Sequence, residues 1–292
     1  MQALYAFFIY GVTPVHRRNK PAKLNWLLGG RCGMSDWDAL YLKKGEFIAD
    51  SDKAKSWNRG AYLVQSLGHC GDCHSPHGML GNSLADKAGQ SQKYLSGGLV
   101  DNWYSSPLNQ EAVTGLAAWS ENDIAGFLKT GRTGRVAAIG VMADVIVNST
   151  QYLTDADLAS IAMYLKSVPP SKKDRLKHGR CKTAGSQVYM DNCNYCHASD
   201  GTGANASIPN LVHNEAVNAE NPASLIRIVL EGSRMTARQS DTTTLSMPTM
   251  REMLTDAKVA NALTFIRASW GNCALPVSRR QVHRMRRALH LE

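Results

Sequence analysis

Two short segments of the sequence combine paired cysteines with an adjacent histidine. Residues 68–78 read GHCGDCHSPHG and residues 192–201 read NCNYCHASDG, so each contains Cys-x-x-Cys-His. Cysteines at this spacing lie about one helical turn apart, so both thiols can bond to the two vinyl groups of one haem. The next histidine is then placed to bind the iron. The motifs predict two covalently attached haem c groups, with Cys70, Cys73, Cys193 and Cys196 as attachment residues and His74 and His197 as iron ligands.

Two other chemistries use Cys-x-x-Cys pairs. Structural zinc sites usually draw both pairs from nearby sequence, whereas these pairs are about 120 residues apart and each carries a histidine that zinc does not require. A thioredoxin-like redox site would follow a β-strand rich in branched residues, and neither motif does. The spacing therefore favours haem over zinc or thiol redox chemistry.

A haem iron that carries electrons needs a sixth ligand, and methionine is the usual one. Met142, in GVMADV, lies 68 residues after the first motif histidine, and Met247, in LSMPTM, lies 50 residues after the second. Each precedes a predicted helix by a short loop and could therefore lie over a haem face, so both are predicted iron ligands. Met250 and Met253 are weaker rivals of Met247, and Met163 falls inside a predicted helix.

An internal repeat surrounds the motifs. LTDADLASIAMYLKS, residues 153–167, aligns with LTDAKVANALTFIRA, residues 254–268, at an offset of 101 residues. Thr154 and Thr255 are placed as helix N-caps, and apolar residues follow at helical spacing in both copies. Ser120 is a further predicted cap. These segments are interpreted as the closing helices of two equivalent all-helical units, each built around one haem.

Matching opening helices precede the two motifs. RGAYLVQSLGHC, residues 59–70, and AGSQVYMDNC, residues 184–193, both place a glycine and an aromatic residue before the first motif cysteine. Because glycine permits close approach of two backbones, the opening and closing helices are expected to cross tightly. Residues 1–12, MQALYAFFIYGV, resemble the closing helices, with Leu4, Phe7 and Phe8 at the matching positions; the alternative is an unrelated amphipathic helix.

The bulk properties fit a globular protein with anionic partners. The 292 residues carry a net charge of +9, and no apolar run approaches the roughly 20 residues that cross a bilayer. The three cysteines outside the motifs, Cys32, Cys181 and Cys273, follow no recognised spacing and are interpreted as small hydrophobic residues. In the C-terminal segment 277–292, Val282, Met285 and Leu289 would form an apolar stripe, either an interfacial membrane anchor or part of a frayed basic tail.

The chain resembles the triple-haem cytochrome c subunits of membrane-bound quinoprotein dehydrogenases. The likeness is strongest at residues 3–15, 57–78, 95–104, 119–132, 141–167 and 261–272. It supports Met142 and Met247 as axial ligands independently of their spacing. The family has three Cys-x-x-Cys-His motifs and this sequence has two, so a third haem is expected in the full-length family and the missing motif would precede Met1.

The resemblance implies an electron-transfer subunit without bond chemistry of its own. It would accept electrons from a subunit containing pyrroloquinoline quinone that oxidises alcohols or sugars, and pass them to ubiquinone. It implies a place on the periplasmic side of the inner membrane, in contact with the membrane surface; no signal peptide is recognised in the sequence. A dihaem peroxidase is the alternative function, and basic residues without interleaved aromatics do not indicate a nucleic-acid partner.

The expected fold is all-α, with tandem class I cytochrome c-like domains. The expected division of the chain has five parts. Residues 1–44 would be the closing helix and linker of an incomplete preceding domain, 45–168 the first cytochrome c domain, 169–184 a linker, 185–275 the second cytochrome c domain, and 276–292 a basic C-terminal tail.

Overall fold

A computed structural model of the chain describes most of its residues. The described ranges are 2–18, 31–42, 45–85, 92–133, 136–171, 185–203, 208–234 and 246–291. The chain divides into two compact units, residues 1–46 and 47–292, and each is considered by itself. Most of the predicted linker at 169–184 lies outside the described residues.

The first unit contains two helices, α1 (Gln2–Tyr10) and α2 (Arg31–Tyr41). A helix at the N-terminal segment is therefore confirmed. The three side chains that match the closing helices, Leu4, Phe7 and Phe8, are at least half exposed, so α1 presents an apolar surface. Its assignment to a preceding cytochrome c domain stays a prediction.

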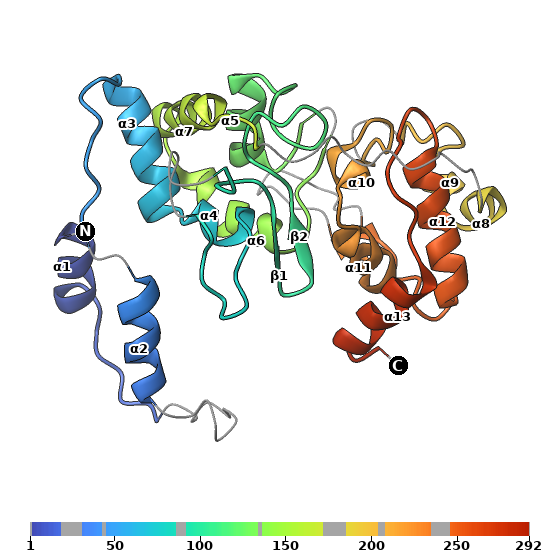
Figure 1. Ribbon diagram of the computed structural model, residues 1–292, viewed down its shortest axis with the longest axis horizontal. Coiled ribbons are helices and arrows are strands. Elements are labelled where there is room, and N and C mark those ends of the chain that lie inside the picture. Colours follow the sequence, from blue (N-terminus) through green and yellow to red (C-terminus); the bar gives the residue numbers. More distant parts are fainter. Residues whose placement is uncertain are drawn as a thin grey trace. The chain divides into compact units, whose positions relative to one another are not determined.

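The second unit is predominantly helical, and its two halves repeat one pattern (Figure 1). The first half contains α3 (Lys55–Tyr62), a π-helical turn (Leu63–Leu67), α4 (Cys70–His74), α5 (Glu121–Thr130), α6 (Gly140–Asn148), a 3₁₀ turn (Thr150–Tyr152) and α7 (Asp155–Ser167). The second half contains α8 (Ser186–Asn192), α9 (Asn194–His197), α10 (Glu215–Asn218), α11 (Ala223–Glu231), α12 (Asp256–Ala268) and α13 (Arg279–Ala288).

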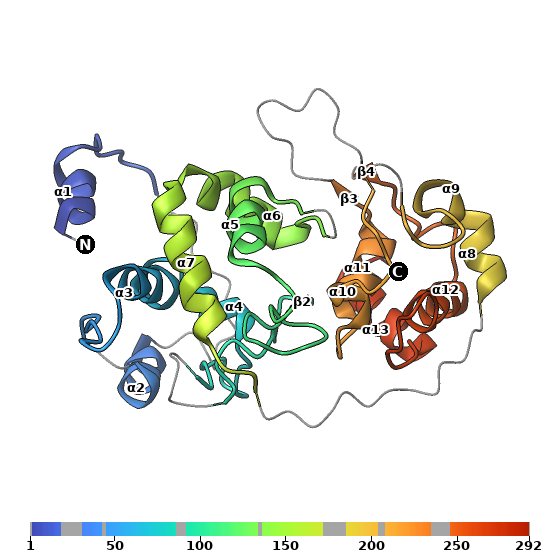
Figure 2. The same ribbon diagram turned by 90° about the horizontal axis from the view of Figure 1, so that it is seen from above.

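In both halves the opening helix crosses the closing helix at a glycine. A Cβ atom on Gly60 would lie 1.9 Å from the carbonyl oxygen of Ser160, and a Cβ on Gly185 would lie 2.2 Å from that of Asn261. Ser160 and Asn261 are equivalent positions of the 101-residue repeat. The predicted tight crossings of α3 with α7 and of α8 with α12 are therefore confirmed, as Figure 2 shows from above.

The predicted N-caps are present. The side chains of Thr154 and Thr255 accept hydrogen bonds from the third backbone N–H of α7 and α12, and Ser120 forms a reciprocal capping box with Asp123 at the start of α5. Each cap satisfies an N–H group that the helix leaves unpaired. These local signals therefore fix where the helices begin.

A cation near the end of each closing helix donates to a distant backbone carbonyl, which lies before α5 in the first half and in α10 in the second. Lys166 of α7 donates to the carbonyl of Leu116 at 3.1 Å, and Arg267 of α12 donates to the carbonyl of Val217 at 2.7 Å. Both the donors and the acceptors are 101 residues apart. Arg267 is fully buried, and burial lowers the pKa of its guanidinium to about 10.

The two halves differ in the segment that follows the motif. The motif histidines are 123 residues apart whereas the closing helices are 101 apart, so the first half is 22 residues longer at this point. The longer segment forms an antiparallel hairpin of β1 (Gly98–Val100) and β2 (Trp103–Ser105). Asp101 and Asn102 both have positive φ, as a two-residue type I′ turn requires. A second strand pair, β3 (Ser233–Arg234) and β4 (Ser246–Met247), lies in the other half.

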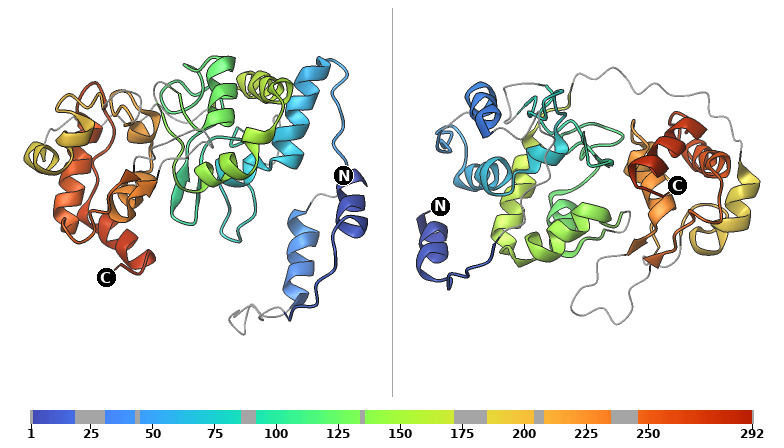
Figure 3. Two further views of the ribbon diagram at one scale, coloured as in Figure 1. Left: turned by 180° about the vertical axis from the view of Figure 1, so that it is seen from behind. Right: turned by 90° about the horizontal axis from the view of Figure 1, so that it is seen from below.

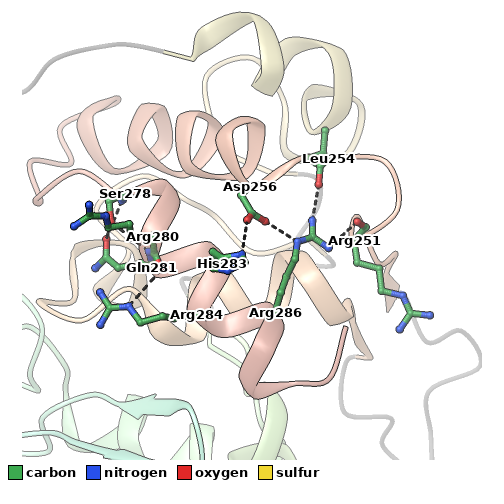
Figure 4. A network of polar contacts seen from close by, with 9 residues as sticks. All are labelled: Arg251, Leu254, Asp256, Ser278, Arg280, Gln281, His283, Arg284 and Arg286. Carbon is green, nitrogen blue, oxygen red and sulfur yellow. Dashed lines mark hydrogen bonds and ion pairs between the residues drawn. The ribbon is translucent and has the colours of Figure 1, made fainter. Parts of the chain in front are cut away.

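The C-terminal helix α13 corrects both interpretations of the apolar stripe. Val282 and Met285 are buried in the core of the second half, and Leu289 packs against that core. Arg286 pairs with Asp256 of α12 at 2.7 Å and also donates to the carbonyls of Arg251 and Leu254, as Figure 4 shows. The views of Figure 3 likewise place α13, coloured red, beside α12. The stripe is neither frayed nor open to a membrane because the core of the protein covers it.

We predict that Gly60→Ala destabilises the chain strongly. The added methyl group would overlap the backbone of α7, and forcing it in should cost about 3 kcal/mol in the free energy of unfolding, at the upper end of ordinary overpacking. Denaturant unfolding measures this cost.

Gly126→Ala on α5 is the matched control, because its Cβ would meet nothing within 4 Å. Alanine is the better helix former, so this variant should be as stable as the parent or about 0.5–1 kcal/mol more stable. Equal stabilities for the two variants would contradict the tight crossing.

Candidate haem-binding sites

The first motif forms its own short helix. The π-helical turn ends at Gly68, His69 adopts a left-handed conformation with φ of 47°, and α4 then runs from Cys70 to His74. This places Cys70, Cys73 and His74 on one short helix, with the two cysteines about one turn apart. Both thiols are free and half-buried. The arrangement fits attachment of one planar macrocycle beside α4, with the imidazole directed to its metal.

The ring of His74 is oriented by a backbone acceptor. Its Nδ1 lies 2.7 Å from the carbonyl oxygen of Ser106, and because a carbonyl only accepts, Nδ1 carries the proton and Nε2 is the unprotonated nitrogen. Burial lowers the pKa of His74, so the imidazole is neutral at neutral pH, while the Ser106 carbonyl acts in the opposite direction. A neutral, oriented imidazole is the form that binds iron.

The β1–β2 hairpin holds this acceptor in place. The backbone N–H of Gly97 donates to the carbonyl of His74 at 2.8 Å, and that of Leu95 donates to the hydroxyl of Ser75 at 3.0 Å. A Cβ on Gly98 would lie 2.4 Å from the Ser75 carbonyl oxygen. The start of the hairpin therefore packs directly on the motif backbone, and its end supplies Ser106.

The second motif has the same order of parts. Cys193 caps α9, which ends at His197, and Tyr189 of α8 donates to the carbonyl of Ala198 at 2.6 Å. Both motif thiols are free; Cys193 is half-buried and Cys196 is exposed. Tyr189 also packs against Phe265 and Trp270, which fixes α8 on α12.

The ring of His197 is buried but held more loosely. Burial lowers its pKa, and the carbonyl of Pro209 acts against this shift. The contact falls short of hydrogen-bond geometry, so Nδ1 of His197 is a buried nitrogen without a well-formed partner. The carbonyl of Pro209 is thus the backbone acceptor beside His197, as the carbonyl of Ser106 is beside His74.

A buried polar network positions the loop that contains Pro209. Asn218 donates to the side-chain oxygen of Asn272 at 2.7 Å, and Asn272 donates to the carbonyl of Leu211 at 2.8 Å. Arg267 donates to the carbonyls of Val217 and Ala219 at 2.7 and 2.9 Å. The loop is thus tied to α12 and the segment after it.

The thiols lack the properties of redox or zinc ligands. Burial raises the pKa of Cys70 and of Cys193 to about 11, and it also raises the pKa of Cys73. Reactive thiols have lowered pKa values instead. In the described ranges, no three His, Cys, Asp or Glu side chains come together as a metal site. The residues present fit covalent haem better than either alternative.

The predicted methionine ligands lie on separate elements of the two halves. Met142 is the third residue of α6, so the segment between it and α7 is largely helical rather than the expected short loop. Met247 is the last residue of β4 and pairs with Ser233 of β3. Gly232 packs against the carbonyl oxygen of Met247, where a Cβ atom would lie only 2.5 Å away. Both side chains are half-buried. Their role as iron ligands stays a prediction.

The rival methionines occupy other environments. Met250 is buried in the core of the second half, Met253 is 66% exposed, and the sulfur of Met163 accepts a hydrogen bond from Ser56 at 3.3 Å. The position of each of these three methionines is therefore explained without a role in binding haem.

Two features of these sites were not predicted from the sequence. Ser106 is 32 residues from His74, and a backbone acceptor leaves no side-chain signal; the proline that follows it, Pro107, was the only hint. Cys273 is disulfide-bonded, so its interpretation as a small hydrophobic residue is wrong. The side chains of Cys32 and Cys181 lie outside the described residues.

The second half of the chain matches a known protein family. Residues 183–270, which contain the second motif, match the cytochrome c family. The sequence of this region is therefore similar to cytochrome c, in agreement with its helices and with the geometry of its motif.

Relatives extend the similarity over nearly the whole chain. It is 38% identical to the alcohol dehydrogenase (quinone) cytochrome c subunit of Gluconobacter oxydans (strain 621H), 36% to the gluconate 2-dehydrogenase cytochrome c subunit of Pantoea cypripedii, and 30% to the fructose dehydrogenase cytochrome subunit of Gluconobacter japonicus. The matches cover 94, 94 and 98% of this chain. The chain is thus a relative of dehydrogenase cytochrome c subunits, which confirms the resemblance noted in the sequence. It spans 60, 66 and 64% of their lengths.

Among the described helices, none has both the length and the apolar character needed to cross a membrane.

We predict that Met142→Ala and Met247→Ala each change one haem only. A thioether ligand raises the reduction potential, so its removal should lower the potential of the haem in the same half and leave the other unchanged. Spectroelectrochemical titration of the haem-loaded chain measures both. Met253→Ala is the control and should change neither potential. If Met142→Ala or Met247→Ala leaves both potentials and spectra unaltered, that ligand assignment is incorrect.

Proposed function

We propose that this chain is an electron-transfer subunit with tandem class I cytochrome c-like domains. The first domain comprises residues 45–168 and the second 185–275, each folded around one covalently attached haem c. The observation that carries the proposal is the orientation of His74: its Nδ1–H is engaged by the Ser106 carbonyl, which leaves Nε2 available beside two free thiols on the same helix.

When bound, haem c supplies reversible one-electron transfer. The residues of the chain attach it, orient it and bury it. The four motif thiols would form the thioether bonds, His74 and His197 would bind the iron, and Met142 and Met247 would be its further ligands and would raise its potential. The chain performs no bond chemistry on an alcohol or a sugar.

The donor in this proposal is a separate dehydrogenase subunit, and the acceptor is ubiquinone. Support comes from relatives that are named as cytochrome subunits of alcohol, gluconate and fructose dehydrogenases. A donor that contains pyrroloquinoline quinone, as the sequence resemblance implies, is the form of the partner that we propose.

We place the protein on the periplasmic side of the inner membrane, where its acceptor would be accessible. With the apolar stripe of α13 buried, contact with an anionic membrane surface would use charge rather than insertion. The exposed residues of α13 that would provide it are Arg279, Arg280, Arg284 and Arg287. In Figure 4, Arg280 and Arg284 extend away from the network around Asp256.

A dihaem peroxidase would use the same attachment motifs but would need one iron with an open or displaceable sixth position. The names of the relatives favour a cytochrome subunit, and a methionine is proposed for each haem. Turnover of hydrogen peroxide by the haem-loaded chain would favour the peroxidase.

The function is tested by electron flow through the haem-loaded chain. We expect both haems to be reduced when the oxidised protein is mixed with a quinoprotein dehydrogenase subunit and its alcohol or sugar, and to be reoxidised by a soluble ubiquinone analogue. Stopped-flow spectra in the haem bands measure both steps, with the dehydrogenase lacking substrate as the control. Haems that stay oxidised with every donor tested, alongside peroxide turnover, would overturn the proposal.

A further inference from the structure

We propose that the β1–β2 hairpin is the joint that fixes the second domain against the first and couples this contact to the ring of His74. The inference rests on the proposed function in one respect only, the role of His74 as an iron ligand. Its structural part concerns contacts between residues 98–106 and α11, which lie side by side in the second unit (Figure 1).

The hairpin is anchored to the first motif at both ends. At its start, Gly97 donates to the carbonyl of His74, and Gly98 packs on the carbonyls of Cys73 and Ser75. At its end, Ser106 accepts the proton of the His74 ring. A displacement of the hairpin would therefore move the acceptor that orients this imidazole.

The outer edge of the hairpin is paired with the second domain. In the register of the two strands, Tyr104 stands opposite Leu99, and its N–H and C=O are both directed to Ser224 of α11. The Ser224 hydroxyl accepts from the Tyr104 N–H at 2.8 Å and donates to the Tyr104 carbonyl at 2.9 Å. One side chain thus satisfies two backbone groups that an edge strand would otherwise expose.

The turn of the hairpin is held by an arginine of the same helix. The guanidinium of Arg227 lies 4.6 Å from the centroid of the Trp103 ring and donates to the Asp101 carbonyl at 2.6 Å. Glu231, one turn further along α11, accepts from Arg227 Nε at 2.7 Å and orients it. The Arg227 side chain is only 15% exposed, so the cation–π contact is largely shielded from water.

Trp103 also connects the hairpin to the element that carries Met142. A Cβ on Gly140 would lie 2.5 Å from the Trp103 ring, and Gly140 has a φ of +54°, so this close approach requires glycine. Gly140 is the first residue of α6 and Met142 the third. The hairpin therefore contacts both the histidine and the methionine elements of the first domain, as well as α11 of the second.

The 22 additional residues that lengthen the first half include this hairpin, and we assign them a role in electron transfer. Electron transfer between two haems depends on the distance between them and on their relative orientation. A hairpin that is hydrogen-bonded to both domains would hold both constant. A second contact, from the Trp119 indole N–H to Glu215 at 3.0 Å, closes the same interface near α10.

The test is amide hydrogen exchange on the full haem-loaded chain carrying Ser224→Ala and Arg227→Gln together. We expect exchange to become about tenfold faster or more in both 98–105 and 223–231, because opening of the joint no longer breaks these contacts. Exchange in α7 and α12 should be unchanged. Arg251→Gln is the matched control and should alter neither segment. Within the described part of the chain, the Arg251 side chain pairs with its exposed neighbour Glu252.

A second readout links the joint to the haem. In the double variant we expect the potential of the first haem to shift while that of the second stays constant. Arg227→Lys replaces the double variant in this test if the double variant does not fold. It keeps the positive charge but loses the planar guanidinium that stacks on Trp103. It should accelerate amide exchange in the same two segments.

The proposed joint would be contradicted if the amide exchange rate stayed unchanged in residues 98–105 or in residues 223–231. It would also be contradicted if the rate rose equally throughout the chain. Haem content is measured on the same samples by mass. A chain without haem would refute the proposed function, whereas the exchange pattern decides the joint separately.

Discussion

The hydrogen bond from the ring of His74 to the carbonyl of Ser106 is the interaction on which the first site depends. It fixes the tautomer and plane of an imidazole that stands next to two free thiols on one short helix. The acceptor belongs to the backbone, so its position depends on the fold of the whole 95–106 segment rather than on one side chain. The tight packing of Gly98 on the motif follows from this requirement.

The two halves of the second unit pack their opening and closing helices in the same way. Gly60 and Gly185 allow the opening helix to approach the closing helix, and Lys166 and Arg267 hold equivalent loops through backbone carbonyls. They differ in how the loop that faces the histidine is secured. The first half uses a hairpin. The second half uses the buried network of Asn218, Asn272 and Arg267, and its acceptor at Pro209 forms a poorer contact with His197.

Features encoded locally could be predicted from the sequence. Thr154 and Thr255 mark helix starts because each side chain accepts a hydrogen bond from a backbone N–H only three residues further along. Each Cys-x-x-Cys-His motif is likewise contained within five residues. Features that depend on distant partners could not. An apolar stripe such as Val282 and Met285 could pack equally well against a membrane or against a protein core. The ion pair between Arg286 and Asp256, which holds α13 on α12, shows that it packs against the core. Ser106, the disulfide of Cys273 and the contact of Arg227 with Trp103 likewise join residues that no spacing rule connects.

The central claim is that each paired-cysteine helix carries a covalently bound haem. Intact-mass measurement of the chain after maturation in a periplasm, combined with a pyridine haemochrome assay, tests it most directly. The account predicts a mass above that of the 31.9 kDa polypeptide by two haem groups, and a colour that acidified organic solvent does not extract. A colourless protein with the mass of the bare polypeptide would contradict it.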